Sequence, residues 1–166
     1  MDAPGAGTAW PAPVDRVSAA LRQAGAEARI EEFATGTPTA QDAANAVGCD
    51  LAQIVKSLLF DCDGRAVLVL VPGERRADPE KVAAATSAAA ARVAGAAQVE
   101  QATGYEPGGV APFALRAVDQ VLVDKRLLGS GPLWVGAGSE RHMVGMPASE
   151  LVRVARAQQV DVTRDD

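Results

Sequence analysis

Apolar residues recur along this chain at two spacings, which together predict a domain built from both helices and strands. Recurrence every three or four residues predicts helices, whereas alternation and short apolar runs predict strands. The predicted helices cover residues 14–24, 39–47, 78–86 and 96–102, and a closing helix starts at residue 147. The predicted strands cover residues 28–33, 54–60, 65–71, 90–94, 118–124, 133–135 and 142–146.

The strongest short-range signal is a β-hairpin in the first half of the chain. Residues 54–60 and 65–71 are apolar runs on either side of Asp63-Gly64, a dipeptide that favours a tight turn. Both strands are apolar on both faces, so we expect them in the middle of a covered sheet.

Lys56 is unusual within this hairpin. A period of two residues places it on the same strand face as Ile54, Leu58 and Phe60. A lysine among apolar neighbours is seldom fully buried without a partner. Two interpretations stay open: its ammonium reaches solvent at the strand end, or it projects into a pocket to meet an anionic or carbonyl group.

A loop rich in glycine and proline, over residues 101–115, is the second candidate feature. It combines Gly104, Gly108 and Gly109 with Pro107 and Pro112. Glycine lets the backbone approach a ligand closely and proline restrains the loop, so its free N–H groups are suited to holding a carbonyl or an oxyanion. The apolar residues 110–115 are expected to line the pocket wall. The alternative is a pair of turns that join two elements.

Two further candidates lie near strand ends. Asp124 ends a predicted strand and either caps the short turn that follows or belongs to the site. Residues 136–139, with the sequence Gly-Ala-Gly-Ser, are predicted to form a second glycine turn. Its backbone either faces the first loop or serves only as a turn.

At 166 residues the chain is expected to be one domain with a real core. Residues 1–13 carry several prolines and glycines and are predicted to be a flexible leader. Residues 159–166 are predicted to be a charged tail, which frays from residue 161 onward. The domain itself is predicted over residues 14–158. No apolar run is long enough to span a bilayer and no signal-peptide pattern opens the chain, so a cytoplasmic location is expected.

The net charge of −5 argues against broad non-specific binding to nucleic acid, so DNA is not expected as a partner. It leaves room for a local contact with one nucleic-acid end. The two cysteines, Cys49 and Cys62, fit no metal spacing and are expected to be buried fillers. With His142 as the single histidine, neither a metal site nor a Cys–His nucleophile pair is expected.

In their order along the chain, these features resemble the YbaK/prolyl-tRNA synthetase-associated editing-domain family. They are Lys56 within Val-Lys-Ser-Leu-Leu, the helix start after the hairpin, residues 103–112 with the sequence Thr-Gly-Tyr-Glu-Pro-Gly-Gly-Val-Ala-Pro, and Val123-Asp124 ahead of the second glycine segment. The resemblance spans roughly residues 14–158. It implies an α+β fold with a mixed, mostly antiparallel central sheet flanked by helices. Free-standing members are aminoacyl-tRNA deacylases, which hydrolyse the ester between a wrong amino acid and the terminal adenosine of a tRNA.

The resemblance also implies roles for individual residues. Lys56 is implied to contact the terminal nucleotide or the ester, and Gly108 and Gly109 to supply catalytic amides. The residues implied to bind the substrate are Thr103, Gly104, Val110, Pro112, Asp124, Gly136, Gly138, Ser139 and His142. His142 stands in for a position near the second glycine segment that varies among relatives. No cofactor is implied, and the implied partners are an aminoacylated tRNA acceptor end and, secondarily, an aminoacyl-tRNA synthetase.

The mechanism we infer needs no protein nucleophile, because an ester is already activated relative to an amide. Backbone N–H groups hold the carbonyl oxygen as negative charge develops and water attacks, each donor contributing about 3–4 kcal/mol. A pocket lined by small residues would admit alanine, serine or cysteine, which suits editing on tRNA-Pro or a related tRNA. Two rival interpretations stay open: a binding module without turnover, and an interaction protein whose glycine loops are only turns.

Overall fold

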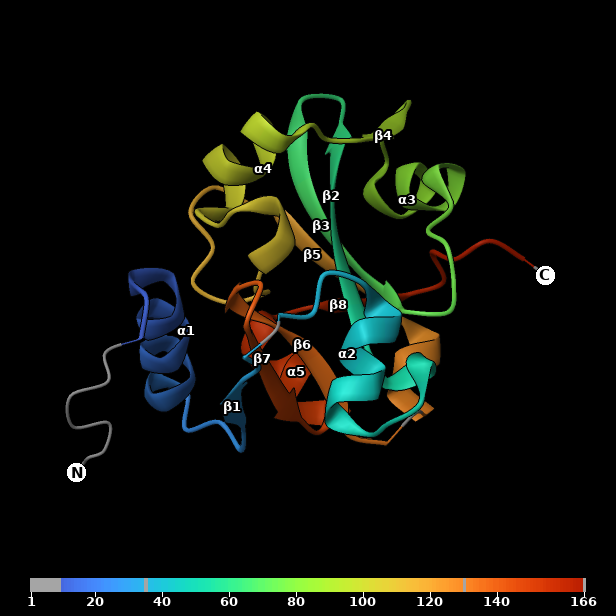
Figure 1. Cartoon of the computed structure of the whole chain (residues 1–166). Helices are drawn as coiled ribbons and strands as arrows, with labels where there is room; N and C mark the ends of the chain where they lie inside the picture. Colours follow the sequence, from blue (N-terminus) through green and yellow to red (C-terminus); the bar gives the residue numbers. More distant parts are fainter. Residues whose placement is uncertain (1–9, 35, 130, 166) are drawn as a thin grey trace.

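The computed structural model describes residues 10–34, 36–129 and 131–165, which form helices packed on two hydrogen-bonded sheets (Figure 1). The strands are β1 Arg29–Glu32, β2 Val55–Cys62, β3 Arg65–Pro72, β4 Ala91–Val93, β5 Gln120–Asp124, β6 Leu133–Ser139, β7 His142–Met146 and β8 Gln158–Val160. The helices are α1 Ala12–Gln23, α2 Ala40–Val47, α3 Pro79–Thr86, α4 Ala96–Thr103 and α5 Ala148–Ala155, with 3₁₀ turns η1 Leu51–Gln53, η2 Pro107–Gly109 and η3 Lys125–Gly129. The predicted α+β class is confirmed.

The strands are divided between a five-stranded sheet of order β4-β2-β3-β5-β8 and a three-stranded sheet of order β1-β7-β6. Only the pairs β3–β5 and β5–β8 are parallel among the described strands, so a mixed, mostly antiparallel arrangement is confirmed. An isolated bridge between Ile54 and Trp134 links the two sheets. A β-bulge interrupts the pairing of β6 with β7 between Gly136 and Ser139.

The predicted hairpin is formed by β2 and β3. Asp63 and Gly64 both have positive φ values, 55° and 88°, which is the geometry of a type I′ turn. The Asp63 carboxylate accepts the N–H groups of Ala89 and Ala90 at 2.7 and 3.3 Å, which holds this turn against the chain before β4. Residues 67–71 of β3 are fully buried, as expected for a central strand.

Local signals placed several helix ends correctly. Thr39 caps α2 by accepting the N–H of Asp42 at 3.0 Å, and Gly48 ends that helix with a φ of 74°. Asp78 caps α3 in the same way, with its carboxylate accepting the N–H of Glu80. Helix α1 begins at Ala12, so residues 12 and 13 of the predicted leader are helical; residues 1–9 lie outside the described part.

The predicted fraying of the C-terminal segment is wrong. Strand β8 pairs in parallel with β5, and the residues that follow it, Val162 and Thr163, are fully buried. The Asp161 carboxylate forms ion pairs with Lys81 and Arg126 at 3.2 and 3.1 Å. These contacts join residues far apart in the sequence, so no local pattern could predict them.

Strand β3 is covered on both faces. On one face Leu68 and Leu70 belong to a buried cluster that includes residues of α1, α5 and the three-stranded sheet. On the other face Val69 packs in a second cluster with Val82 of α3 and Val162. The first cluster spans both sheets, which makes them parts of one core. None of the helices described has the length and apolar character required to cross a membrane.

Candidate functional site

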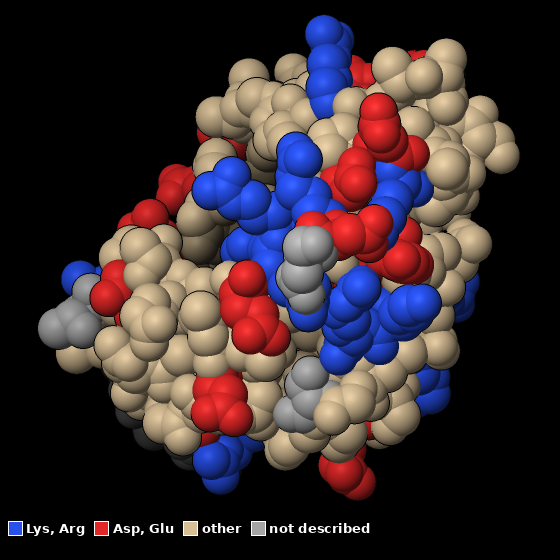
Figure 2. All heavy atoms as spheres, turned by 90° about the vertical axis from the view of Figure 1, so that its right-hand side faces the viewer, with Lys and Arg blue, Asp and Glu red and all other residues tan. Residues whose placement is uncertain are grey.

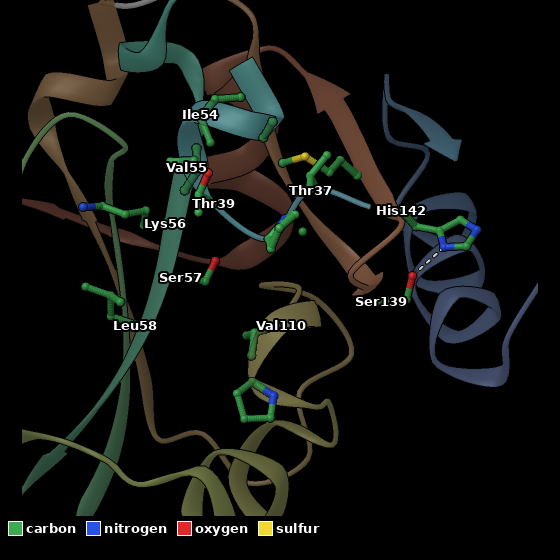
Figure 3. A pocket seen from close by; sticks show the side chains of 17 residues that line it. Thr37, Thr39, Ile54, Val55, Lys56, Ser57, Leu58, Val110, Ser139 and His142 are labelled. Atoms are coloured by element: carbon green, nitrogen blue, oxygen red, sulfur yellow. Dashed lines mark hydrogen bonds between the residues drawn. The ribbon is translucent and has the colours of Figure 1, made fainter. Parts of the chain in front are cut away.

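A cavity of about 400 Å³ lies between the start of α2, one edge of β2, η2 and the β6–β7 hairpin (Figure 3). It is lined by residues 37–40, 43, 54–58, Pro107, Gly108, Val110, Gly136, Ser139, His142 and Met143. Small and apolar side chains such as Ala43, Ile54 and Met143 form one part of the wall, and they also belong to a buried cluster. Within the described chain, no Asp or Glu side chain lines this cavity.

The structure brings about half of the predicted site residues together. Those that line the cavity are Lys56, Gly108, Val110, Gly136, Ser139 and His142. Gly109 lies behind the lining and packs against Ser139. Thr103, Gly104, Pro112, Asp124 and Gly138 do not line the cavity.

The two glycine-rich segments pack so closely that side chains are excluded between them. A Cβ atom on Gly109 would lie 2.7 Å from the Cα of Ser139, and one on Gly136 would collide with the carbonyl of Val110. The backbones of the segments therefore face one another. Residues 136–139 are not the predicted turn: they belong to β6, and the hairpin turns at Glu140 and Arg141, between the paired residues Ser139 and His142.

The backbone amides of η2 differ in their availability. Gly109 donates its N–H to the carbonyl of Glu106 at 2.9 Å, so this amide is already engaged. Among the described residues no well-formed backbone hydrogen bond is found for the N–H of Gly108 or Val110, although the 3₁₀ geometry of η2 turns the Val110 N–H toward the carbonyl of Pro107. Both of these residues line the cavity, so Gly108 and Val110, rather than Gly108 and Gly109, are the candidate pair of donors.

Lys56 borders the cavity, but its ammonium is directed elsewhere. Its Nζ donates to the carbonyl of Arg75 at 2.5 Å, and Figure 3 shows the side chain extending away from Val110 and Ser139. Burial lowers the pKa of Lys56, and the nearby charge of Arg76 lowers it further. The ammonium is therefore held by the segment between β3 and α3.

Ser139 and His142 form a hydrogen-bonded pair at one side of the cavity (Figure 3). The Ser139 Oγ lies 2.6 Å from Nδ1 of His142 and accepts the N–H of Arg141 at 3.0 Å. On the far side of the imidazole, Nε2 lies 3.9 Å from a carboxylate oxygen of Glu32, and the Trp10 ring meets the imidazole edge-on. Burial lowers the pKa of His142, so its imidazole is neutral at pH 7.

The predicted residues outside the cavity have structural contacts instead. The buried Asp124 accepts the N–H of Val162 at 3.0 Å and that of Arg126 at 3.1 Å, which favours the capping interpretation. Thr103 is buried, and its hydroxyl donates to the carbonyl of Val99. Gly104 ends α4 with a φ of 82° and, like Gly138, borders a separate cavity.

Ser57 lines the cavity and was not among the predicted site residues. It lies next to Lys56, on the strand face that also carries Val55 and Leu59. A polar residue between the apolar Val55 and Leu59 on that face was a signal that could have identified it. The contribution of residues 37–40 could not be found in this way, because it depends on how the start of α2 packs against β2.

Neither metal nor thiol chemistry is supported by the side chains present. The described residues contain no group of three or more His, Cys, Asp and Glu placed to hold a metal ion. Cys62 is buried and Cys49 is half-buried, and burial raises the pKa of both thiols. Both therefore remain protonated and poorly nucleophilic at neutral pH.

Relatives of known sequence share most of the chain. The profile of a family described as the aminoacyl-tRNA editing domain matches residues 34–154. "Uncharacterized protein YwhH" of Bacillus subtilis (strain 168) is 30% identical over 138 residues, which cover 82% of this chain and 87% of that protein. A proline–tRNA ligase of Xanthomonas oryzae pv. oryzae (strain MAFF 311018) is 32% identical over 145 residues, which cover 84% of this chain but 26% of the ligase.

Comparison with solved structures leads to the same family as comparison of sequences. The crystal structure of a candidate trans-editing enzyme for prolyl-tRNA synthetase has a TM-score of 0.88 and 32% identity, and the match covers 95% of this chain and 100% of that one. The hypothetical protein APE2540 has a TM-score of 0.84 and 29% identity, with 90% and 99% of the two chains covered. By profile, sequence and fold, the chain belongs to the aminoacyl-tRNA editing domain family.

Proposed function

We propose that this protein is a deacylase that hydrolyses the ester of a mischarged aminoacyl-tRNA, with a small amino acid such as alanine, serine or cysteine on tRNA-Pro or a related tRNA. The observation that carries the proposal is a small cavity with two unused amides, those of Gly108 and Val110, in a member of the editing-domain family. The small and apolar wall formed by Ala40, Ala43 and Met143 suits a short side chain.

The proposed reaction is attack of water on the ester carbon. The N–H groups of Gly108 and Val110 hold the carbonyl oxygen as it becomes negatively charged, which is where hydrogen-bond donors accelerate acyl transfer most. No Asp or Glu is among the described lining residues, the Glu140 carboxylate packs against Gly108 beside the cavity, and His142 is engaged with Ser139. A hydroxyl of the terminal ribose is therefore assigned the task of orienting the water.

The RNA end is proposed to approach beside Lys56. Arg76 is close enough to lower the pKa of Lys56, and Arg164 donates its N–H to the carbonyl of Arg76 at 2.8 Å, so these three cations lie on adjacent segments. Figure 2 shows Lys and Arg side chains gathered in the middle of one face, with acidic side chains beside them. Such a surface suits contact with a few phosphates near the RNA end rather than with a long duplex.

The proposal is tested with tRNA-Pro charged separately with alanine, serine, cysteine and proline. We expect the purified protein to release at least one of the three wrong amino acids faster than proline. Lys56→Ala should lower that rate while the protein stays folded. Survival of all four aminoacyl-tRNAs over a prolonged incubation would contradict a deacylase.

One observation favours a binding module without turnover as the second candidate. The Lys56 ammonium is bound to the Arg75 carbonyl rather than directed into the cavity. A binding module predicts stoichiometric binding of an aminoacyl-tRNA end, with the ester intact after recovery. The same charged tRNAs distinguish the two functions.

A further inference from the structure

Ser57 carries a polar atom that the fold leaves without a partner. Its Oγ is shielded from solvent and has no hydrogen-bond partner, and among the described side chains the same is true only of Nε2 of His142. Buried polar groups in folded proteins are nearly always paired, and an unpaired one is unfavourable. The Nε2 atom of His142 lies on the far side of its imidazole, near Glu32, whereas Ser57 lines the cavity, so the Ser57 hydroxyl is the unpaired atom placed where a ligand would bind.

The geometry of β2 directs Ser57 toward that cavity. Figure 3 shows its side chain pointing into the space between β2 and Val110, whereas Lys56 extends to the other side of the strand. The Oγ atom reaches a neighbouring staggered position by rotation about a single torsion. A small ligand group in the cavity can therefore meet the hydroxyl without movement of the backbone.

The main chain of Ser57 faces the same way. The carbonyl of Ile54 accepts from Gly73 on the β3 side, whereas the carbonyl of Leu59 accepts from Ala94 on the opposite side. Alternation along the strand therefore directs the N–H and C=O of Ser57 to the side of Leu59, away from β3. Strand β4 covers that edge of β2 only at residues 60–62. Ser57 thus offers a hydroxyl and a carbonyl oxygen at one uncovered edge.

The chemistry of the cavity indicates which ligand group these oxygens bind. The α-amino group of an aminoacyl ester is a cation with three donors. The described lining itself holds no Asp or Glu, and the carboxylate of Glu140 packs against Gly108 rather than against Ser57. At β2, neutral oxygens accept the hydrogen bonds of the amino group. We propose, on the basis of the deacylase function above, that Ser57 binds the α-amino group through Oγ and its main-chain carbonyl, and so selects aminoacyl over plain acyl esters.

The experiment compares two esters of the same tRNA, alanyl and propionyl, which differ in the amino group. Ser57→Ala should lower kcat/KM for the alanyl ester roughly 10- to 100-fold, the range for a hydrogen bond to a charged group, and change the propionyl ester less than about twofold. The melting temperature should stay the same or rise, because an unpaired hydroxyl is removed. Ser149→Ala, at an exposed serine of α5, is the matched control and should change neither rate.

Three results would overturn the assignment. Equal losses on both esters would show that the hydroxyl acts on the ester rather than on the amino group. A lower melting temperature together with loss on both esters would show a structural role. Unchanged kcat/KM for the alanyl ester would show that the hydroxyl makes no contact with the substrate.

A failure of the deacylase proposal is distinguishable from a failure of this one. If the wild-type protein hydrolyses neither ester, the proposed function fails. The Ser57 assignment is then decided by the affinity for a non-hydrolysable amide analogue of alanyl-adenosine and for its desamino counterpart. A preference for the amino form that Ser57→Ala removes supports the contact, and absence of such a preference overturns it.

Discussion

Asp124 and Ser139 each end a strand, but their polar groups are used in opposite ways. Around Asp124, both carboxylate oxygens accept backbone N–H groups, and Lys81, Arg126 and Asp161 form ion pairs that fasten the C-terminal segment to the sheet. Around Ser139, the cavity is lined by the amides of Gly108 and Val110 and by the Ser57 hydroxyl, which is buried and has no hydrogen-bond partner. In the first region the polar groups are hydrogen-bonded within the protein and stabilise the fold. In the second region they remain available to a ligand.

The largest effect on stability is expected in the first region. Asp124→Ala leaves the buried N–H groups of Val162 and Arg126 without acceptors, which should lower the free energy of unfolding by about 3 kcal/mol. Urea denaturation measures the change. Asp119→Ala, at an exposed residue whose ion pair with Arg65 spans 3.9 Å, is the control and should change stability by less than about 1 kcal/mol. Equal effects of the two substitutions would remove the distinction between the regions.

A substitution in η2, beside the cavity, is expected to lower stability less than Asp124→Ala does but to lower the deacylation rate more. Gly109→Ala places a Cβ against the backbone of Ser139, which cannot move aside as a flexible side chain could. The cost should be about 1–3 kcal/mol, and deacylation should fall because η2 is pushed from β6. Gly129→Ala is the control, since nothing lies within 4 Å of a Cβ there. Full activity of the Gly109 variant would show that this close packing does not shape the cavity.

The smallest expected effect is a dependence of the free energy of unfolding on pH, which arises from the titration of His142. Because burial lowers its pKa below 6.5, the unfolded chain binds a proton more readily than the folded one does. The contribution of neutral His142 to the free energy of unfolding is therefore complete above about pH 6.5, and it is lost as the pH falls toward the pKa of His142 in the folded protein. As the single histidine, His142 is the side chain expected to titrate there. Urea denaturation at about pH 7.5 and about pH 5.5 should show a decline that His142→Asn flattens; an identical decline in the variant would contradict the assignment.

Much of the fold was predictable where neighbours in the sequence determine the structure. The turn at Asp63-Gly64 and the caps at Thr39 and Asp78 depend on a few adjacent residues, and each is present. The folded C-terminal segment was not predictable, because Lys81 meets Asp161 across 80 positions of sequence. The sequence alone indicated neither the division into two sheets nor the bulge in β6.

The candidate site was predicted only in part, because some of its features depend on contacts that are not local in the sequence. Spacing and resemblance placed Lys56 and the glycine-proline loop together, and both line one cavity. The direction of the Lys56 ammonium depends on a carbonyl in the segment after β3, and the engagement of the Gly109 amide depends on Glu106. Such hydrogen bonds are set by the path of the backbone, which residue types do not specify.

The proposed mechanism depends most on the unused amide of Val110. This residue has a φ of −63°, which proline adopts without strain, so Val110→Pro deletes the N–H. Proline also restrains the preceding residue, Gly109 of η2, so the melting temperature must show that the variant is folded. Val110→Ala is the matched control, because it shortens the side chain and keeps the amide.

The decisive measurement is the single-turnover rate of alanyl-tRNA-Pro hydrolysis by these two variants. We expect Val110→Pro to be about 100-fold slower than Val110→Ala, the loss typical of one donor to a developing oxyanion. Equal rates for the two folded variants would contradict the claim that this amide stabilises the transition state.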